Sequence, residues 1–335
     1  MSHAGGGSPN YAGGGSLAEV VRSGFVESWH RGSVAVLAAD GAVLDWAGDP
    51  YGAIFPRSAN KPMQAVGMLR AGLTVADSAE LALVAASHWG EPRHLTVVLA
   101  MLARAGLTGS ALRCPAALPL GPAAAEAHLR AGGEPGPVLR DCSGKHTGML
   151  LTCQSAGWPL EDYVEPGHPL QQRLRVAVEE LSGHPVAVTG VDGCGAPVFA
   201  LPLVGLARAF LRLVSAAPGT PERAVADAMR AHPELVSGTG AMDARVMRAI
   251  PGALSKGGAE GVLGVAVPGV GAVAVKVDDG TFRAHLPVLR DALERLGVAV
   301  PPDLAEPVVV LGGGRVVGEI RSRTEWATSP WATSR

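Results

Sequence analysis

The chain has 335 residues, 47% of them hydrophobic, and a formal net charge of −2. This length allows one large domain or two ordinary ones with a sizeable core, and the near-neutral charge argues against binding to nucleic acid or to an anionic membrane surface. The apolar runs are too short to cross a bilayer, the start of the chain has no secretory pattern, and four cysteines are too few for a disulfide scaffold. We therefore expect a cytoplasmic protein that binds neither nucleic acid nor membranes.

The first part of the chain is expected to form strands. Short apolar or β-branched runs cover residues 25–29, 33–39 and 42–48, and Asp40-Gly41 is a typical hairpin signal between the last two. The preceding segment, "MSHAGGGSPNYAGGGS", is rich in glycine and serine. We expect residues 1–16 to be a flexible tail.

Helical patterns follow in the middle of the chain. Ser58 stands where the N-cap of a helix is expected, and Gly72 ends that helix. Asp77 and Glu80 have the spacing of a capping box before the next one. Further helices are expected at residues 92–106, 143–156, 169–181, 203–216, 221–231 and 243–250.

The end of the chain returns to strands. Apolar runs at 262–267 and 271–277 precede a helix near 286–296, and "PVVVLGGGRVVGEIR" has the pattern of strand, glycine turn and strand. Strands at both ends with helices between them indicate an α+β fold whose terminal strands share one antiparallel sheet. We expect one domain over residues 17–321 and a peripheral C-terminal tail over residues 322–335.

One short segment has the spacing of a nucleophile and a base. "FPRSANKPMQ" places Ser58 three residues before Lys61, and residues at this spacing lie on one face of a helix. A lysine amine can take the proton of a serine hydroxyl if the amine is neutral, which requires burial or a nearby cation. The alternative is a plain N-cap serine followed by a solvated lysine.

Two further segments contain candidate catalytic groups. Ser87 lies in "ASHWGEPRH", where the alternative is a polar residue that only ends a helix. Lys256 lies in "ALSKGGAEGV", before two glycines and ahead of an expected strand, where the alternative is a loop charge. Neither segment identifies a reaction by itself.

Two segments contain cysteines beside other polar groups. "RDCSGKHTGMLL" includes Cys142 and Lys145, and "GVDGCGAPVFALP" includes Cys194. Two thiolates and a nitrogen could hold Zn²⁺, although the spacing is not that of a zinc finger. Buried free thiols are the alternative, and Cys114 and Cys153 are interpreted as plain cysteines.

Taken together, these segments resemble the bacterial L-asparaginase II family. The similarity covers roughly residues 17–321 and is carried by "GFVESWHRGSVAV", "FPRSANKPMQA", "ASHWGEPRH", "CSGKHTGML", "VDGCGAP", "AMDARVMRA" and "SKGGAEGV". The resemblance implies a serine β-lactamase/glutaminase-like fold, hydrolysis of L-asparagine to L-aspartate and ammonia, and a homodimer.

The resemblance also implies roles for individual residues. Two Ser-Lys pairs match the family's catalytic positions: Ser58 with Lys61, and Ser87 with Lys256. The family's substrate-contacting positions are matched by Arg57, His146 and Asp192. Its zinc site, which is not needed for the chemical step, is matched by Cys142, Lys145 and Cys194. One position departs from the pattern, because Ala241 stands where many members have arginine.

Two other functions stay open. A glutaminase or a β-lactamase-type hydrolase would use the same Ser-x-x-Lys spacing; the chain has no "KTG" segment, but the single methylene that separates glutamine from asparagine is worth only about 1–3 kcal/mol in a pocket. A non-catalytic zinc-binding protein would use its cysteine segments for structure, and Ser58→Ala would leave its function intact.

Overall fold

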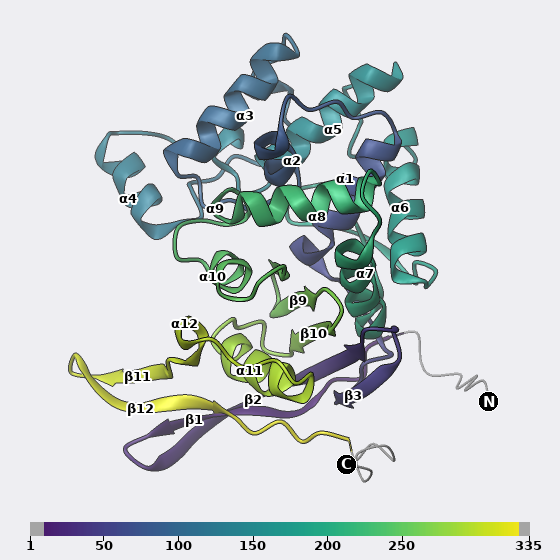
Figure 1. The fold of residues 1–335 in the computed structure, drawn as a ribbon. Coiled ribbons are helices and arrows are strands. Elements are labelled where there is room, and N and C mark those ends of the chain that lie inside the picture. Colours follow the sequence, from purple (N-terminus) through teal and green to yellow (C-terminus); the bar gives the residue numbers. More distant parts are fainter. Residues whose placement is uncertain (1–9, 328–335) are drawn as a thin grey trace.

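A computed structural model describes residues 10–327 of the chain. Its centre is an eight-stranded sheet in which β11, β12, β1, β2, β10, β9 and β8 are neighbours in that order and β3 pairs with β2 (Figure 1). Every pair in this sheet is antiparallel. The strands are β1 (Gly15–Arg22), β2 (Phe25–Ala38), β3 (Val43–Ala47), β8 (Leu254–Gly258), β9 (Val262–Val267), β10 (Gly271–Val277), β11 (Val308–Gly312) and β12 (Arg315–Ser322). Two short ladders join β4 (Ala53–Ile54) to β7 (Leu201–Pro202) and β5 (Thr189–Val191) to β6 (Pro197–Phe199).

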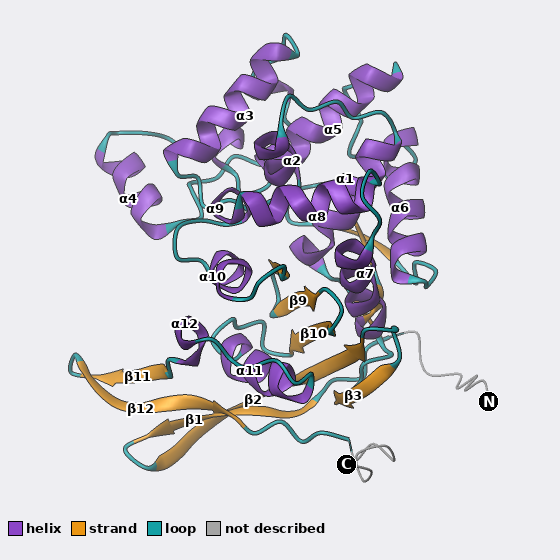
Figure 2. Cartoon of the chain, viewed as in Figure 1, coloured by secondary structure: helices purple, strands orange, loops and turns teal. Residues whose placement is uncertain are grey.

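Helices gather mainly on one side of this sheet (Figure 2). They are α1 (Lys61–Arg70), α2 (Ser78–Val84), α3 (Pro92–Arg104), α4 (Pro122–Arg130), α5 (Ser143–Ala156), α6 (Pro169–Ser182), α7 (Leu203–Ser215), α8 (Pro221–Ala231), α9 (Pro233–Val236), α10 (Met242–Ala249), α11 (His285–Arg295) and α12 (Pro302–Ala305). In the described part of the chain, no helix combines the length and apolar character that a bilayer crossing requires.

Alternation along the central strands explains why both faces of the sheet are covered. Successive side chains of a strand point to opposite faces. On β2, Ala35 and Leu37 belong to the larger core, which includes Phe210 of α7. Val34 and Val36 belong to the second core, together with apolar residues of α11. The sheet therefore separates two hydrophobic layers.

The two ends of the chain lie side by side in the sheet. β1 and β12 pair with Val20 opposite Ile320, and the last two strands form a hairpin in which Gly313 and Gly314 have φ of 57° and 76°. This confirms the α+β prediction with terminal strands in one antiparallel sheet. It also confirms the hairpin predicted for the glycine-rich end.

Some predicted boundaries are wrong. The runs at 25–29 and 33–39 form one continuous strand, β2, because the intervening "HRG" pairs with β1: Arg31 lies opposite Ser16 and Gly32 opposite Gly15. β1, α4, β8 and α12 are not predicted by the sequence patterns. The capping interaction is confirmed, since the Asp77 carboxylate accepts a hydrogen bond from the backbone N–H of Glu80.

The structure also describes part of both expected tails. The boundary at residue 16 falls inside β1, and before it the Tyr11 hydroxyl donates to Asp278 at 2.6 Å. At the other end, the Trp326 indole donates to Asp291 at 2.9 Å. Residues 1–9 and 328–335 of the two tails lie outside the described residues.

Candidate active site

The four catalytic candidates lie around the sheet edge formed by β8. Ser58 belongs to a 3₁₀ turn over Arg57–Asn60, Lys61 is the first residue of α1, Ser87 follows α2, and Lys256 lies inside β8. Ser58 is therefore not the N-cap of α1, because that helix begins later, with Pro62 in its first turn. Lys256 precedes the expected strand at 262–267, which is β9, but it also lies inside β8, a strand that the sequence patterns do not predict.

The backbone around Ser58 is tightly constrained. Arg57, which precedes it, has a φ of 50°, a left-handed conformation that is uncommon for a residue with a side chain. Strand β8 runs directly against this turn: a Cβ atom on Gly258 would lie 2.4 Å from the carbonyl oxygen of Pro56 and 2.8 Å from the nitrogen of Ala59. Only glycine permits this approach. Such strain is typical of functional sites.

Lys61 contacts Ser87 and not Ser58. Its side chain is only 2% exposed, and its Nζ donates to the Ala86 carbonyl at 2.7 Å, to Ser87 Oγ at 2.8 Å and to Asp141 Oδ2 at 3.4 Å. These contacts use all three donors of an ammonium group. Among residues 10–327, no group forms a hydrogen bond with the Ser58 hydroxyl, so the expected Ser58–Lys61 contact is replaced by a Lys61–Ser87 contact.

Lys256 is the second buried lysine. It is 1% exposed; its Nζ donates to the Gly257 carbonyl at 2.5 Å and lies 3.6 Å from Asp243 Oδ2. Burial lowers the pKa of Lys256 to about 8, although the Asp243 carboxylate opposes this effect. In the part of the chain that the structure describes, Lys256 makes no hydrogen bond to Ser87. Both lysines are therefore buried, which is one of the conditions under which a lysine amine is neutral.

Asp141 is a central residue that the sequence analysis does not single out. Burial opposes its ionisation, but the positive charges of Lys61 and Arg140 outweigh burial and hold the pKa of Asp141 below its usual range. Its ion pair with Lys61 places a fixed negative charge beside the lysine amine. The only feature of the sequence that points to Asp141 as a site residue is its position in the polar segment "RDCSGKH".

Two cavities meet at Ser58. The smaller, of about 90 Å³, is polar and is lined by Arg57, Lys61, Arg140, Asp192 and neighbouring residues. The larger, of about 540 Å³, is lined by Ser87, Lys256 and many apolar side chains. Ser58, Asp141 and Ala259 line both. The serine hydroxyl therefore stands at the junction of a charged and an apolar chamber.

The smaller cavity holds a charge pair that can recognise a zwitterion. Arg57 Nε donates to Asp192 Oδ1 at 2.7 Å, and both side chains are partly exposed. Arg140 adds a second guanidinium, which donates to the Gly193 carbonyl at 3.0 Å. A guanidinium binds a carboxylate through paired hydrogen bonds, and a carboxylate binds an ammonium group. This chamber is therefore suited to the backbone groups of a free amino acid.

A cluster of buried thiols adjoins the smaller cavity. Cys142 and Cys194 line that cavity, and the sulfur atoms of Cys114 and Cys142 lie within 4.8 Å of each other. Hydrogen bonding from Cys142 lowers the pKa of Cys194; burial opposes this change and Lys145 favours it. Lys145 Nζ donates to Cys194 Sγ at 3.2 Å. Cys114, which the sequence analysis interprets as a plain cysteine, is buried in the hydrophobic core and also adjoins this cluster.

The donor atoms of this cluster fit a zinc ion. Sulfur and imidazole nitrogen are preferred Zn²⁺ ligands, and the ligand atoms of Cys114, Cys142 and His146 lie within 4.8 Å of one another. The His146 Nε2 atom is buried and has no hydrogen-bond partner within residues 10–327. Two overlapping sets of zinc ligands are therefore available. One set is Cys114, Cys142 and His146, and the other is the expected set of Cys142, Lys145 and Cys194.

His146 lies away from the place expected for a substrate contact. It is fully buried, and its Nδ1 forms a 2.7 Å hydrogen bond with the Tyr163 hydroxyl. It is not among the residues that line the two cavities. Burial lowers the pKa of His146. The side chain belongs to the thiol cluster, where only the folded chain could place it.

A protein-family model described as L-asparaginase II matches residues 18–322. A solved structure of a beta-lactamase from Mycobacterium bovis is similar over 79% of this chain and 94% of its own, with 14% identity and a TM-score of 0.42. The structure of Mglu in its native form is similar over 80% of this chain and 63% of its own, with 16% identity and a TM-score of 0.34. A comparison with curated protein sequences finds no match.

Proposed function

Because the chain belongs to the L-asparaginase II family, we propose that it hydrolyses L-asparagine to L-aspartate and ammonia by transferring the acyl group to Ser58. The family supports asparaginase-type amidohydrolase activity. The observation that carries the proposal is the position of the Ser58 hydroxyl, which forms no hydrogen bond with any described residue, between the charged cavity and the cavity that holds Ser87 and Lys256.

The charged cavity holds the α-carboxylate and the α-ammonium group of the substrate. The α-carboxylate of asparagine pairs with Arg57 and its α-ammonium with Asp192, so that two new ion pairs replace the 2.7 Å Arg57–Asp192 contact. The side-chain amide then points out of this cavity toward Ser58. Holding the two reacting groups in this geometry lowers the entropic part of the barrier.

The chemical step needs a proton acceptor and a proton donor. Before reaction Lys61 gives up to solvent one of its three ammonium protons, the one at its longest contact, 3.4 Å from Asp141. Ser58 Oγ then attacks the amide carbon, and its proton passes to the unit formed by Lys61 and Ser87, in which the neutral Lys61 amine accepts a proton from a hydroxyl group. The same unit returns the proton to the leaving nitrogen, the C–N bond breaks, and ammonia departs. Water then attacks the acyl-enzyme ester, which releases aspartate and restores Ser58. Lys256 lines the same cavity as Ser87, and the positive charge of a protonated Lys256 opposes protonation of Lys61. The proton transfer therefore also requires that Lys256 be neutral.

Zinc is proposed as a binding partner of the thiol cluster, held by Cys142, Lys145 and Cys194. A bound Zn²⁺ ion supplies positive charge next to the charged cavity. None of the proton transfers above depends on it. The homodimer and the cytoplasmic location stay predictions.

The test is release of ammonia from L-asparagine and from L-glutamine by the purified chain, measured side by side. We expect the higher kcat/KM for asparagine, and Ser58→Ala should remove turnover while the melting temperature changes little. Mass spectrometry after rapid acid quench should find the acyl adduct on the peptide that contains Ser58. Turnover of glutamine alone would make the chain a glutaminase, and full activity of Ser58→Ala would exclude the proposed nucleophile.

A further inference from the structure

The larger cavity is much bigger than the leaving group of asparagine requires. Ammonia has one heavy atom, whereas this cavity measures about 540 Å³ and the charged one about 90 Å³. The wall of the larger cavity includes six apolar side chains, from Trp89, Leu120, Pro122, Met242, Leu263 and Phe282. Apolar pockets of a few hundred Å³ are the usual form of sites for small organic ligands.

The order of groups along the two cavities assigns the larger one to the amine side of the scissile bond. Arg57 and Asp192 line only the charged cavity, and Ser87 and Lys256 line only the larger one. An amide held by its amino-acid end in the charged cavity has its carbonyl carbon at Ser58. The nitrogen, with any substituent on it, then extends into the larger cavity.

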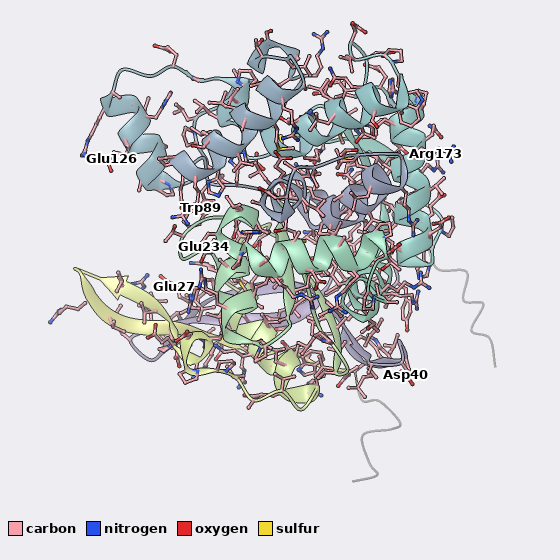
Figure 3. All side chains as sticks on the ribbon, turned by 45° about the horizontal axis from the view of Figure 1, so that its top comes forward. Glu27, Asp40, Trp89, Glu126, Arg173 and Glu234 are labelled. Atoms are coloured by element: carbon pink, nitrogen blue, oxygen red, sulfur yellow. The ribbon has the colours of Figure 1, made fainter. Side chains whose placement is uncertain are left out.

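The wall of the larger cavity is rigid at Trp89, which Figure 3 labels. A Cβ atom on Gly238 would lie 2.4 Å from the Trp89 ring, and one on Gly121 would lie 2.8 Å from the Trp89 Cβ atom. The backbone N–H of Trp89 also donates to the Ser237 carbonyl at 2.7 Å, which fixes the segment that carries the ring. The indole is therefore fixed between two glycine backbones, which makes it a preorganised surface for another ring.

The rim of the same cavity presents exposed apolar side chains. Phe282 is 57% exposed and Leu120 is 55% exposed. His285 also lines the cavity, and its Nε2 atom is buried without a hydrogen-bond partner in the described residues. An apolar chamber with an open rim and a reactive serine at its inner end can admit an apolar substituent on the amide nitrogen, which asparagine itself lacks.

We propose that the larger cavity binds the amine half of N-substituted β-amides of L-aspartate, in which the amide nitrogen carries an aromatic or branched alkyl group. This rests on the proposed function, because the acyl half is the same. The Ser58 Oγ–C bond forms, the C–N bond breaks, and the amine leaves with the proton that Ser58 gave up. Water then hydrolyses the ester, so no other co-reactant is required.

The probe is N4-phenyl-L-asparagine, whose cleavage releases aniline, compared with L-asparagine, whose cleavage releases ammonia. The variant is Leu120→Ser/Phe282→Ser, which removes two exposed rim side chains and no residue of the charged cavity. Leu311→Ser on β11 is the matched control, because Leu311 is also 57% exposed and lines neither cavity. The same substrate is compared across variants, so the intrinsic reactivity of the anilide cancels.

We expect the unmodified chain to cleave both substrates. The double variant should lower kcat/KM for the anilide about tenfold or more, since loss of apolar contact costs roughly this much in a pocket, and should leave kcat/KM for asparagine within about twofold. Leu311→Ser should change neither value.

Three results would overturn the inference. Cleavage of asparagine without cleavage of the anilide would leave the proposed function intact and refute the larger substrate class. Anilide cleavage that the double variant does not weaken would show that the amine half lies elsewhere. No cleavage of either substrate by folded protein would refute the proposed function, and the inference with it. If the anilide is not cleaved and the double variant also turns a dimer into a monomer in sedimentation, the apolar chamber is a subunit interface.

Discussion

Replacing Asp243 with asparagine should move the pH dependence of catalysis toward acid. Asp243 Oδ2 lies 3.6 Å from Lys256 Nζ, and Lys256 is 1% exposed. Burial holds the pKa of Lys256 near 8, and the Asp243 carboxylate is the largest influence that keeps it from falling further. Removing this negative charge destabilises the protonated lysine, so the pKa of Lys256 must fall and its neutral fraction at neutral pH must rise.

The size of the effect follows from the distance. At 3.6 Å and an effective dielectric constant of about 20, Coulomb's law gives an attraction on the order of 4–5 kcal/mol, which is an upper limit because solvent and the asparagine dipole compensate. An opposite charge at this range usually shifts a pKa by about 1–3. Because the proposed proton transfer requires neutral Lys256, whose pKa burial lowers to about 8, we expect Asp243→Asn to move the acid limb of kcat/KM down by about 1–2 pH units.

The assay is kcat/KM for L-asparagine measured from about pH 5 to pH 10. Ser255→Ala is the control, because Ser255 Oγ donates to Asp243 Oδ1 at 2.8 Å and its loss removes a hydrogen bond without removing charge. Asparagine has only one side-chain oxygen, so Asp243→Asn also removes the acceptor of either the Ser255 hydroxyl or the Gly257 N–H. This loss costs about 1–3 kcal/mol of stability. Folding of the variant is therefore checked by thermal melting at each pH. An acid limb that stays in place or moves to higher pH would show that ionisation of Lys256 does not govern catalysis.

Three further outcomes are expected. Ser87→Ala removes the 2.8 Å contact with Lys61 and should lower kcat about 10²–10⁴-fold, as loss of a proton-transfer group does, with little change in KM; unchanged kcat would remove Ser87 from the proton path. Arg57→Lys should raise KM for asparagine more than it lowers kcat, because lysine cannot bind a carboxylate bidentately; a selective fall in kcat would contradict the binding role. Added Zn²⁺ should raise the melting temperature of the chain, and Cys142→Ser or Cys194→Ser should abolish the rise. Cys114→Ala should preserve it, and if it does not, the zinc ligands are Cys114, Cys142 and His146 instead.

The sequence by itself determined most of the helices, several central strands and the α+β architecture, although not β1, α4, β8 or α12. Short apolar runs bounded by turn signals predict β9, β10 and most of β2, and they succeed because a strand that is buried on both faces is a continuous apolar run in the sequence. Asp77 caps α2 as predicted, since a capping interaction spans only one turn. Strands at both ends with helices between them were enough to predict a shared antiparallel sheet, which the pairing of β1 with β12 confirms.

The partners inside the site were decided only by the tertiary structure. Spacing placed Ser58 and Lys61 within reach of each other, but the segment after α2 brings Ser87 to the Lys61 amine. In the same way, Cys114 joins Cys142 and His146 although no local motif links it to them. A sequence pattern constrains neighbours along one helix or strand. Which hydrogen-bond donor meets which acceptor depends on how distant segments pack against the edge of the sheet, because each buried polar group must find a partner among those the fold delivers.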